Sequence, residues 1–200
     1  SERDAFRKFR AALFVQPLVT AIFAASPMVD GALVPENSFR AAVWRDTDPK
    51  RCELPAVIWS EGAGYRDYVE WALDVPMLLI HREGRYIDCR GHSFHDFIAN
   101  GLQGYHATVG DFAMHLSTVF PDVRMKTHLE VRAADMGNRD YVLALPALHA
   151  GLLYDECALD SILKLFGPMD HAAWLEMRDA VPRHGFGVRV GERCVGELAE

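Results

Sequence analysis

Hydrophobic positions recur at helical spacing along much of the chain. Over residues 5–13, the side chains of Phe6, Phe9 and Leu13 fall on one face of a helix, and arginines occupy other positions. Comparable spacing, together with capping and proline signals, predicts further helices. These cover residues 17–25, 65–73, 95–99, 110–118, 139–154, 159–166 and 172–180.

Alternation of apolar and polar residues is typical of strands elsewhere. Residues 77–81 and 85–89 form two such runs around a glycine-containing turn, which predicts a hairpin. Residues 124–132 predict one buried strand, residues 38–48 a loop or short strand, and residues 182–188 an extended segment. Several helices around hairpin-like strands indicate an α+β fold, and the length favours one domain over residues 1–200.

The run 124–132 divides its side chains between two faces, because successive residues of a strand point in opposite directions. Glu130 and Arg132 share one face about 7 Å apart, a spacing suited to a metal ligand beside a phosphate-binding group. The alternative is an edge strand with a solvated charged face, and the alternation alone favours this alternative. The two faces are Met125, Thr127, Leu129 and Val131 on one side and Arg124, Lys126, His128, Glu130 and Arg132 on the other.

Composition narrows the possible partners. The net charge is -7 and no basic run occurs, which argues against nucleic acid. No apolar stretch reaches about 18 residues, so we expect no membrane span. The four cysteines form no C-x-x-C pair and indicate reduced thiols in a cytoplasmic protein. A start at Ser1 without methionine suggests a piece of a longer protein or a trimmed form of one.

Several ordered motifs point to a known family. The most specific is FPDVRMKTHLEVRAAD, which is followed by GLLYD, and FRAAVWRDTD, YVEWALDVPM and YIDCRGHSF precede it in order. From about residue 6 to residue 185 the chain closely resembles the carboxy-terminal half of glutamate–cysteine ligase. The resemblance is to the branch shared by plants and many proteobacteria.

The resemblance implies both a fold and a reaction. The fold is similar to glutamine synthetase, with a curved, mainly antiparallel sheet and helices packed outside, here as a partial domain. The reaction uses ATP and Mg²⁺ to phosphorylate the γ-carboxylate of L-glutamate, after which the amine of L-cysteine displaces the phosphate. Hard carboxylate ligands for the ion and arginines for the phosphoryl group are the physical requirements of this chemistry.

Site residues follow by matching motif positions. The resemblance makes Glu130 a magnesium ligand and Arg132 a catalytic contact to the transferred phosphate. Arg124 matches a position that binds nucleotide, and pairing with an acid is an equal alternative. Arg40 matches an arginine that holds an amino-acid substrate.

Three aromatic or imidazole positions also match the family. Tyr68 and Trp71 match an aromatic stretch that forms the cysteine pocket, although core packing explains both equally well. His115 matches a motif position and is interpreted as a histidine whose polar atoms are satisfied within a helix. Asp135 is expected to cap the turn into Asn138.

The resemblance also implies that something is missing. The family's amino-terminal half carries most metal-binding carboxylates and has no counterpart here, so we expect an incomplete site and an inactive isolated chain. A partner chain with that half, or self-association, is expected to complete it. The alternatives are a non-catalytic remnant that binds a small amino acid or a partner, and a related carboxylate–amine ligase with another amine.

Overall fold

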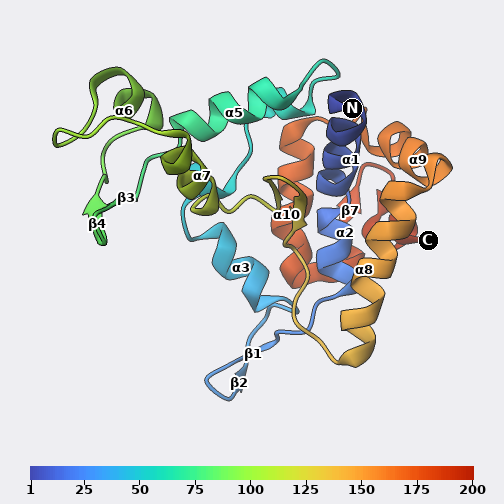
Figure 1. Cartoon of the computed structure of the whole chain (residues 1–200). Helices are drawn as coiled ribbons and strands as arrows, with labels where there is room; N and C mark the ends of the chain where they lie inside the picture. Colours follow the sequence, from blue (N-terminus) through green and yellow to red (C-terminus); the bar gives the residue numbers. More distant parts are fainter.

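Helices dominate the structure, a computed structural model that describes residues 1–200 (Figure 1). The helices are α1 (Glu2–Phe14), α2 (Gln16–Ile22), α3 (Phe39–Arg45), α4 (Pro49–Cys52), α5 (Tyr65–Asp74), α6 (Phe94–Asn100), α7 (Val109–Ser117), α8 (Arg139–Tyr154), α9 (Glu156–Phe166), α10 (His171–His184) and α11 (Val195–Ala199), with the 3₁₀ helices η1 (Ala56–Trp59) and η2 (Gly185–Gly187). The strands are β1 (Met28–Val29), β2 (Ala32–Leu33), β3 (Leu79–Arg82), β4 (Arg85–Asp88), β5 (Val123–Met125), β6 (Leu129–Val131), β7 (Arg189–Val190) and β8 (Arg193–Cys194).

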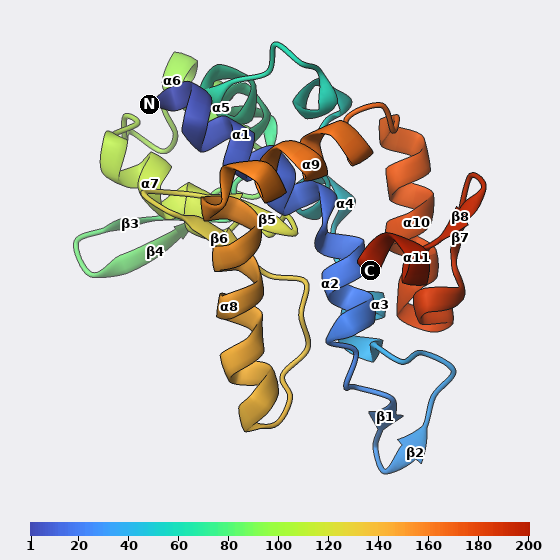
Figure 2. The same cartoon turned by 90° about the vertical axis from the view of Figure 1, so that its right-hand side faces the viewer.

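The main hydrophobic core forms around α1 and α2, which follow each other at the centre of the helical body (Figures 1 and 2). Phe9, Leu13 and Phe14 of α1 are fully buried, as the helical spacing predicts. Helix α9 packs against α1, and α10 packs against α2. The apolar face of α1 therefore lies in the main core, where it packs against the other helices.

A smaller lobe contains the β3–β4 hairpin with α6 and α7 (Figure 1). Its own cluster of Met77, Ile80, Cys89, Phe94 and Phe97 is buried separately from the main core. The buried guanidinium of Arg51 joins this lobe to the body, since it donates to the carbonyls of Pro76 and Thr118. The predicted hairpin is confirmed, and the side chains of Ser93 and Asn138 cap α6 and α8.

The strands form four separate antiparallel pairs of two strands each. The mixture of helices and antiparallel strands confirms the α+β class, but these pairs do not join into the curved sheet that we expected. The prediction of a single strand over residues 124–132 is wrong, because these residues form two strands. The chain reverses between β5 and β6, where the Lys126 N–H donates to the His128 carbonyl at 2.9 Å.

Two further segments differ from the sequence-based prediction. Residues 39–45 form α3 rather than a loop or strand, because the Ser38 hydroxyl caps the helix by accepting from the Ala41 N–H. Helix α10 continues through Pro182 to His184, so the extended segment predicted over residues 182–188 is wrong. No single helix has both the length and the apolar character to cross a membrane; only α8 and α9 taken together, across an 85° bend, meet those two criteria.

Candidate active site

The β5–β6 hairpin places the three predicted charged residues together. Arg124 and Glu130 are direct partners in the register of the two strands. The Glu130 carboxylate accepts from Arg124 Nη2 at 2.7 Å and from Arg132 Nη1 at 2.7 Å. A carboxylate between two guanidinium groups therefore forms the centre of the candidate site.

Arg124 and Arg132 differ in how much of each guanidinium is used by the chain. Buried Arg124 donates to Glu130 through Nε and Nη2, and through Nη1 to the carbonyls of Ser117 and Val119. Arg132 donates a single side-chain hydrogen bond, to Glu130. Arg124 is therefore the anchor of the hairpin, and Arg132 keeps N–H donors free for a ligand. A nucleotide contact by Arg124 stays a prediction.

The surroundings keep Glu130 ionised. Desolvation alone acts to raise the pKa of Glu130, but hydrogen bonds from Arg124 and Arg132 outweigh it, and the pKa is lowered. Desolvation dominates at nearby Asp122, where it raises the carboxyl pKa against the positive charges of Arg178, Arg40 and Arg132. Asp122 accepts from Arg178 Nε at 2.8 Å.

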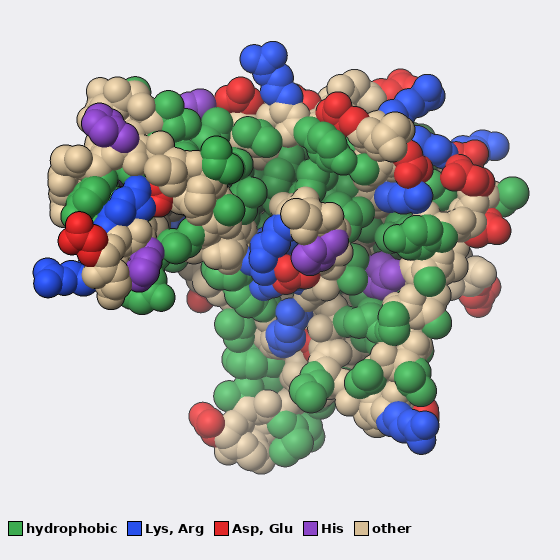
Figure 3. All heavy atoms as spheres, in the orientation of Figure 1, with side chains coloured by type: hydrophobic (Ala, Val, Ile, Leu, Met, Phe, Trp, Pro, Cys, Tyr) green, Lys and Arg blue, Asp and Glu red, His purple; other side chains and the backbone are tan.

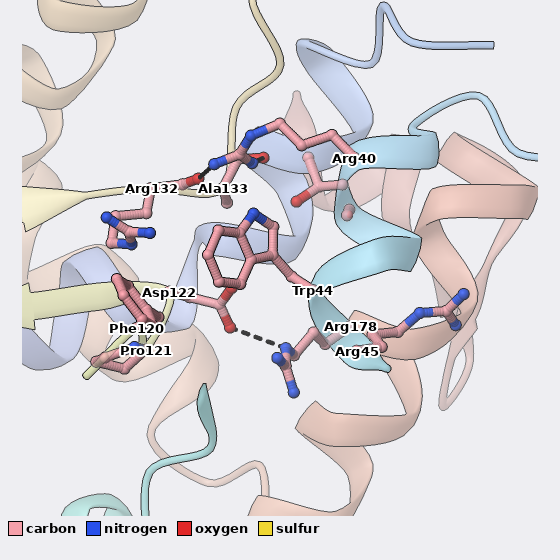
Figure 4. Close-up of a pocket in the computed structure, with 11 residues that line it drawn as sticks. Arg40, Trp44, Arg45, Phe120, Pro121, Asp122, Arg132, Ala133 and Arg178 are labelled. Atoms are coloured by element: carbon pink, nitrogen blue, oxygen red, sulfur yellow. Dashed lines mark hydrogen bonds and ion pairs between the residues drawn. The ribbon is translucent and has the colours of Figure 1, made fainter. Parts of the chain in front are cut away.

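A small pocket opens where α3, the segment before β5 and the segment after β6 meet (Figure 4). Its volume is about 30 Å³, room for about two water molecules and far too little for a nucleotide. The rings of Trp44 and Phe120 lie beside the end of Arg132 (Figure 4). The polar lining is mainly cationic, which suits one small anionic group. The lining residues are Thr20, Arg40, Ala41, Trp44, Arg45, Phe120, Pro121, Asp122, Arg132, Ala133 and Arg178.

Arg40 lies in this pocket but is already engaged with the main chain. Its Nη2 donates to the Arg132 carbonyl at 2.6 Å and its Nη1 to the Ala133 carbonyl at 3.3 Å. Desolvation lowers the pKa of Arg40, yet an arginine stays charged in a protein. The structure thus gives Arg40 a role in holding the segment that carries Arg132, and its substrate contact stays a prediction.

Tyr68 and Trp71 lie outside the pocket. Tyr68 is buried in the main core, where its hydroxyl accepts from the Met125 N–H at 3.1 Å. Desolvation raises the pKa of Tyr68 to about 12. Trp71 packs against Tyr68 and lines a different hollow that also includes Lys50 and His171. A cysteine pocket formed by these two rings stays a prediction.

Two other predicted positions have structural partners. His115 is buried, and its Nε2 lies 2.7 Å from the Ala72 carbonyl, which agrees with a satisfied helix histidine. Asp135 does not cap the turn into Asn138. Its carboxylate instead accepts from the hydroxyls of Ser26 and Ser38, and joins the two segments that flank the β1–β2 hairpin.

The residues present do not fit a metal ion by themselves. No group of three or more His, Cys, Asp or Glu side chains in the 200 residues is arranged so that it could hold a metal ion. Glu130 would supply one ligand, and both of its oxygens face guanidinium groups. A divalent ion prefers several hard oxygen ligands, and the residues around Glu130 do not provide them.

Sequence reasoning missed four residues that form the pocket. Trp44, Phe120, Asp122 and Arg178 come from α3, from the turn before β5 and from α10. All four lie inside motifs that carry the resemblance, FRAAVWRDTD, FPDVRMK and MRDAVPRHG, and that was the available signal. Arg178 lies more than fifty residues away in the sequence, and only the packing of α10 brings it to Asp122.

Known proteins of similar sequence include several chloroplastic glutamate–cysteine ligases. The chain is 41% identical over 188 residues to the chloroplastic glutamate–cysteine ligase of Nicotiana tabacum, covering 92% of this chain and 36% of the relative. Identity to the chloroplastic enzyme of Brassica juncea is 40% over 203 aligned positions, covering all of this chain and 40% of the relative. The chloroplastic enzyme of Arabidopsis thaliana is 39% identical and is covered to 39% of its length. The chain thus spans about two fifths of the length of these relatives.

The comparison contradicts one expectation. We expected a cytoplasmic protein, whereas the names of these relatives place them in the chloroplast. All four cysteines are free in the structure. Because free thiols do not distinguish one reducing compartment from another, the argument from cysteine usage could not decide the location.

The sequence profile described as glutamate-cysteine ligase family 2 (GCS2) matches residues 1–193. That match covers nearly the whole chain, including α3, the β5–β6 hairpin and α10, which together form the pocket. The chain therefore belongs to the glutamate–cysteine ligase family.

Proposed function

We propose that this chain forms part of a ligase that couples L-glutamate to L-cysteine, the first step of glutathione biosynthesis. ATP phosphorylates the γ-carboxylate of glutamate, and the cysteine amine then displaces phosphate from the γ-glutamyl phosphate. Family membership and the names of the relatives support this proposal. We further propose that the complete protein adopts the glutamine synthetase-like fold, with the β5–β6 pair as part of a larger sheet.

The observation that carries the proposal is that Arg132 has unused N–H donors in the pocket. Its guanidinium lines a pocket of mainly cationic polar side chains, and only one of its N–H groups is used, by Glu130. Phosphoryl transfer needs such a donor, because negative charge must be stabilised on the transferred group. Arg132 is therefore assigned to the phosphoryl group, and Arg178 and Asp122 complete the lining of the pocket.

The chemistry needs groups that these 200 residues do not provide. Mg²⁺ and ATP belong to the proposal, but Glu130 is the one carboxylate of this chain assigned to the ion. The other ligands must come from another segment or chain, and the term "complete ligase" below means these 200 residues together with that segment. Glu130 would have to exchange part of its contact with the two arginines for the ion.

An apolar surface is available for that additional segment. On α8, the side chains of Val142, Leu143 and Tyr154 are 61%, 59% and 79% exposed. Leu33 is also 79% exposed, on the β1–β2 hairpin, which projects separately from α8 in Figures 1 and 2. Hydrophobic side chains are visible on this lower part of the molecule in the space-filling view (Figure 3). Exposed apolar side chains that lie together on one helix mark an interaction site. We propose that the segment with the missing carboxylates, or a second copy of this chain, packs there.

Steady-state kinetics of the complete ligase test the proposal. Arg132→Ala is expected to remove about 3–4 kcal/mol of transition-state stabilisation. This loss lowers kcat on the order of a few hundredfold, with a smaller effect on KM. Arg132→Lys should restore only part of the loss, because a point charge does not reproduce the planar guanidinium. A kcat within about twofold of the parent, worth only roughly 0.4 kcal/mol, would reject the role of Arg132. Preference for another amine over cysteine would indicate the related carboxylate–amine ligase instead.

A further inference from the structure

We propose that Trp44 and Phe120 are positioning residues for Arg132. The two rings hold its guanidinium where the pocket opens and leave its N–H groups free. The inference deepens the proposed function and rests on it, since Arg132 is the group assigned to the phosphoryl oxygens. Nothing in the sequence motifs alone indicates this pairing of rings and cation.

The geometry is a closed triangle of close contacts. The Arg132 Cζ atom lies 5.3 Å from the ring centroid of Trp44 and 5.3 Å from that of Phe120. The two ring centroids are themselves 5.3 Å apart. Cations within about 6 Å of an aromatic centroid are attracted by the ring quadrupole. Arg132 is thus held by two rings from two different parts of the chain.

This arrangement differs from that of the neighbouring arginine in a way that matters for a ligand. Arg124 is fixed by hydrogen bonds to Glu130, Ser117 and Val119, which use its donors. Contact with aromatic rings attracts a cation without using any N–H donor. Arg132 is therefore restrained by its two rings and by one hydrogen bond to Glu130, and its other donors remain available to an oxyanion.

The rings are themselves held in place. Trp44 belongs to α3, whose residue Arg40 donates to the carbonyls of Arg132 and Ala133. Phe120 lies shortly before β5, and its N–H donates to the Arg51 carbonyl at 2.8 Å. The ring of Phe120 also lies 5.8 Å from the Arg124 Cζ atom. Both rings therefore approach Arg132 from anchored backbone, as a positioning role requires.

The inference is tested by substitutions that remove an aromatic ring but keep an apolar side chain at the same position. Trp44→Leu and Phe120→Leu remove an aromatic face, whereas Trp44→Phe keeps one, and Phe186→Leu makes the same change on an exposed ring in η2. In the 200-residue chain, NMR of the Arg132 Nε–Hε group should show an aromatic ring-current shift. Trp44→Leu should remove part of that shift, and Trp44→Phe and Phe186→Leu should keep it.

Kinetics of the complete ligase provide the second readout. Trp44→Leu and Phe120→Leu should each lower kcat about tenfold or more, with KM for both amino acids within about twofold, since misplaced groups lose transition-state contacts. Trp44→Phe should recover most of that loss, and Phe186→Leu should match the parent. Equal losses in Trp44→Phe and Trp44→Leu, or parental kcat in both leucine variants, would overturn the inference.

The variant Arg132→Ala distinguishes this inference from the proposed function. If it lowers kcat while the two leucine variants do not, the positioning role alone is rejected. If it leaves kcat unchanged, the phosphoryl role of Arg132 is rejected, and the positioning role in catalysis is rejected with it. Thermal unfolding shows whether each of the two leucine variants folds; Phe120→Leu serves if Trp44→Leu does not.

Discussion

Arg124 and Glu130 face each other across the two strands of the β5–β6 hairpin and form an ion pair in which two nitrogens of Arg124 donate to the carboxylate. Arg124 Nη2 lies 2.7 Å from Glu130 Oε2, and Arg124 Nε lies 3.1 Å from the same oxygen. Arg124 is buried, whereas the Glu130 side chain is 30% exposed. The pair therefore closes the hairpin from inside and presents a charged edge to Arg132 outside.

Neutralising Glu130 should destabilise the chain. Glu130→Gln leaves the buried Arg124 guanidinium without its counter-ion, and we expect a loss of about 2–3 kcal/mol of unfolding free energy at pH 7. Urea denaturation measures it. The lowered pKa means that the contribution of Glu130 is complete above about pH 4.5, its ordinary value, and is lost as pH falls further. The variant should therefore show a weaker acid dependence than the parent.

An exposed ion pair provides the matched control. Asp88 and Arg90 also form a close pair, but both side chains are mostly exposed. Asp88→Asn should leave the unfolding free energy close to that of the parent, because water replaces an exposed partner. A similar loss in both variants would show that burial of Arg124 does not govern the effect.

The sequence predicted the two faces of the 124–132 run better than its path. The turn at Lys126–His128 contains no glycine, proline or asparagine, so nothing marked the reversal, whereas Gly84 with its positive φ marked the β3–β4 turn. The register of β5 and β6 explains why the predicted division of side chains between two faces is still correct. Arg124 pairs with Glu130, so even-numbered residues remain on one side after the chain reverses.

The pocket itself could be predicted only in part. The motifs identified Arg40, Glu130 and Arg132, which do lie close together. Helix α3 was missed because its seven residues are too few to show a helical period, and Trp44 was therefore placed on a loop or short strand. For Tyr68 the pattern leaves two interpretations open, since an aromatic residue on a helix has the same spacing whether its ring contacts a substrate or its hydroxyl accepts from a backbone N–H.

Removing the Tyr68 hydroxyl should change both stability and its dependence on pH. Tyr68→Phe leaves the Met125 N–H without a partner, at a cost of about 1–3 kcal/mol. In the parent, the pKa raised to about 12 means that stability is unaffected below pH 10 and falls as pH rises toward 12. Urea denaturation from pH 8 to 12 should show a shallower alkaline fall in the variant. An identical alkaline fall in both proteins would place the responsible group elsewhere.

Replacing Arg40 should disturb the segment that carries Arg132. Arg40→Ala removes two donors to main-chain carbonyls, and we expect a loss of about 1–3 kcal/mol of unfolding free energy. In the complete ligase, kcat should fall as well, because Arg132 is displaced. Arg85→Ala, an exposed change in β4, should alter neither quantity. A raised KM for one amino acid with unchanged stability and kcat would assign Arg40 to substrate binding alone.

The isolated chain should be inactive and should associate through α8. Phosphoryl transfer needs several carboxylates around Mg²⁺, and Glu130 is the one carboxylate of this chain that we assign to the ion. We therefore expect no measurable ATP-dependent formation of γ-glutamylcysteine.

Sedimentation of the isolated chain should show a species larger than 22.4 kDa. Leu143→Lys should shift the chain toward monomer, because a charge on the exposed apolar face opposes burial. Val57→Lys, a comparable exposed position on η1, should not. Robust activity of the purified chain would show that its own residues complete the site, and a monomer at all concentrations would leave the α8 face to the segment that supplies the missing carboxylates.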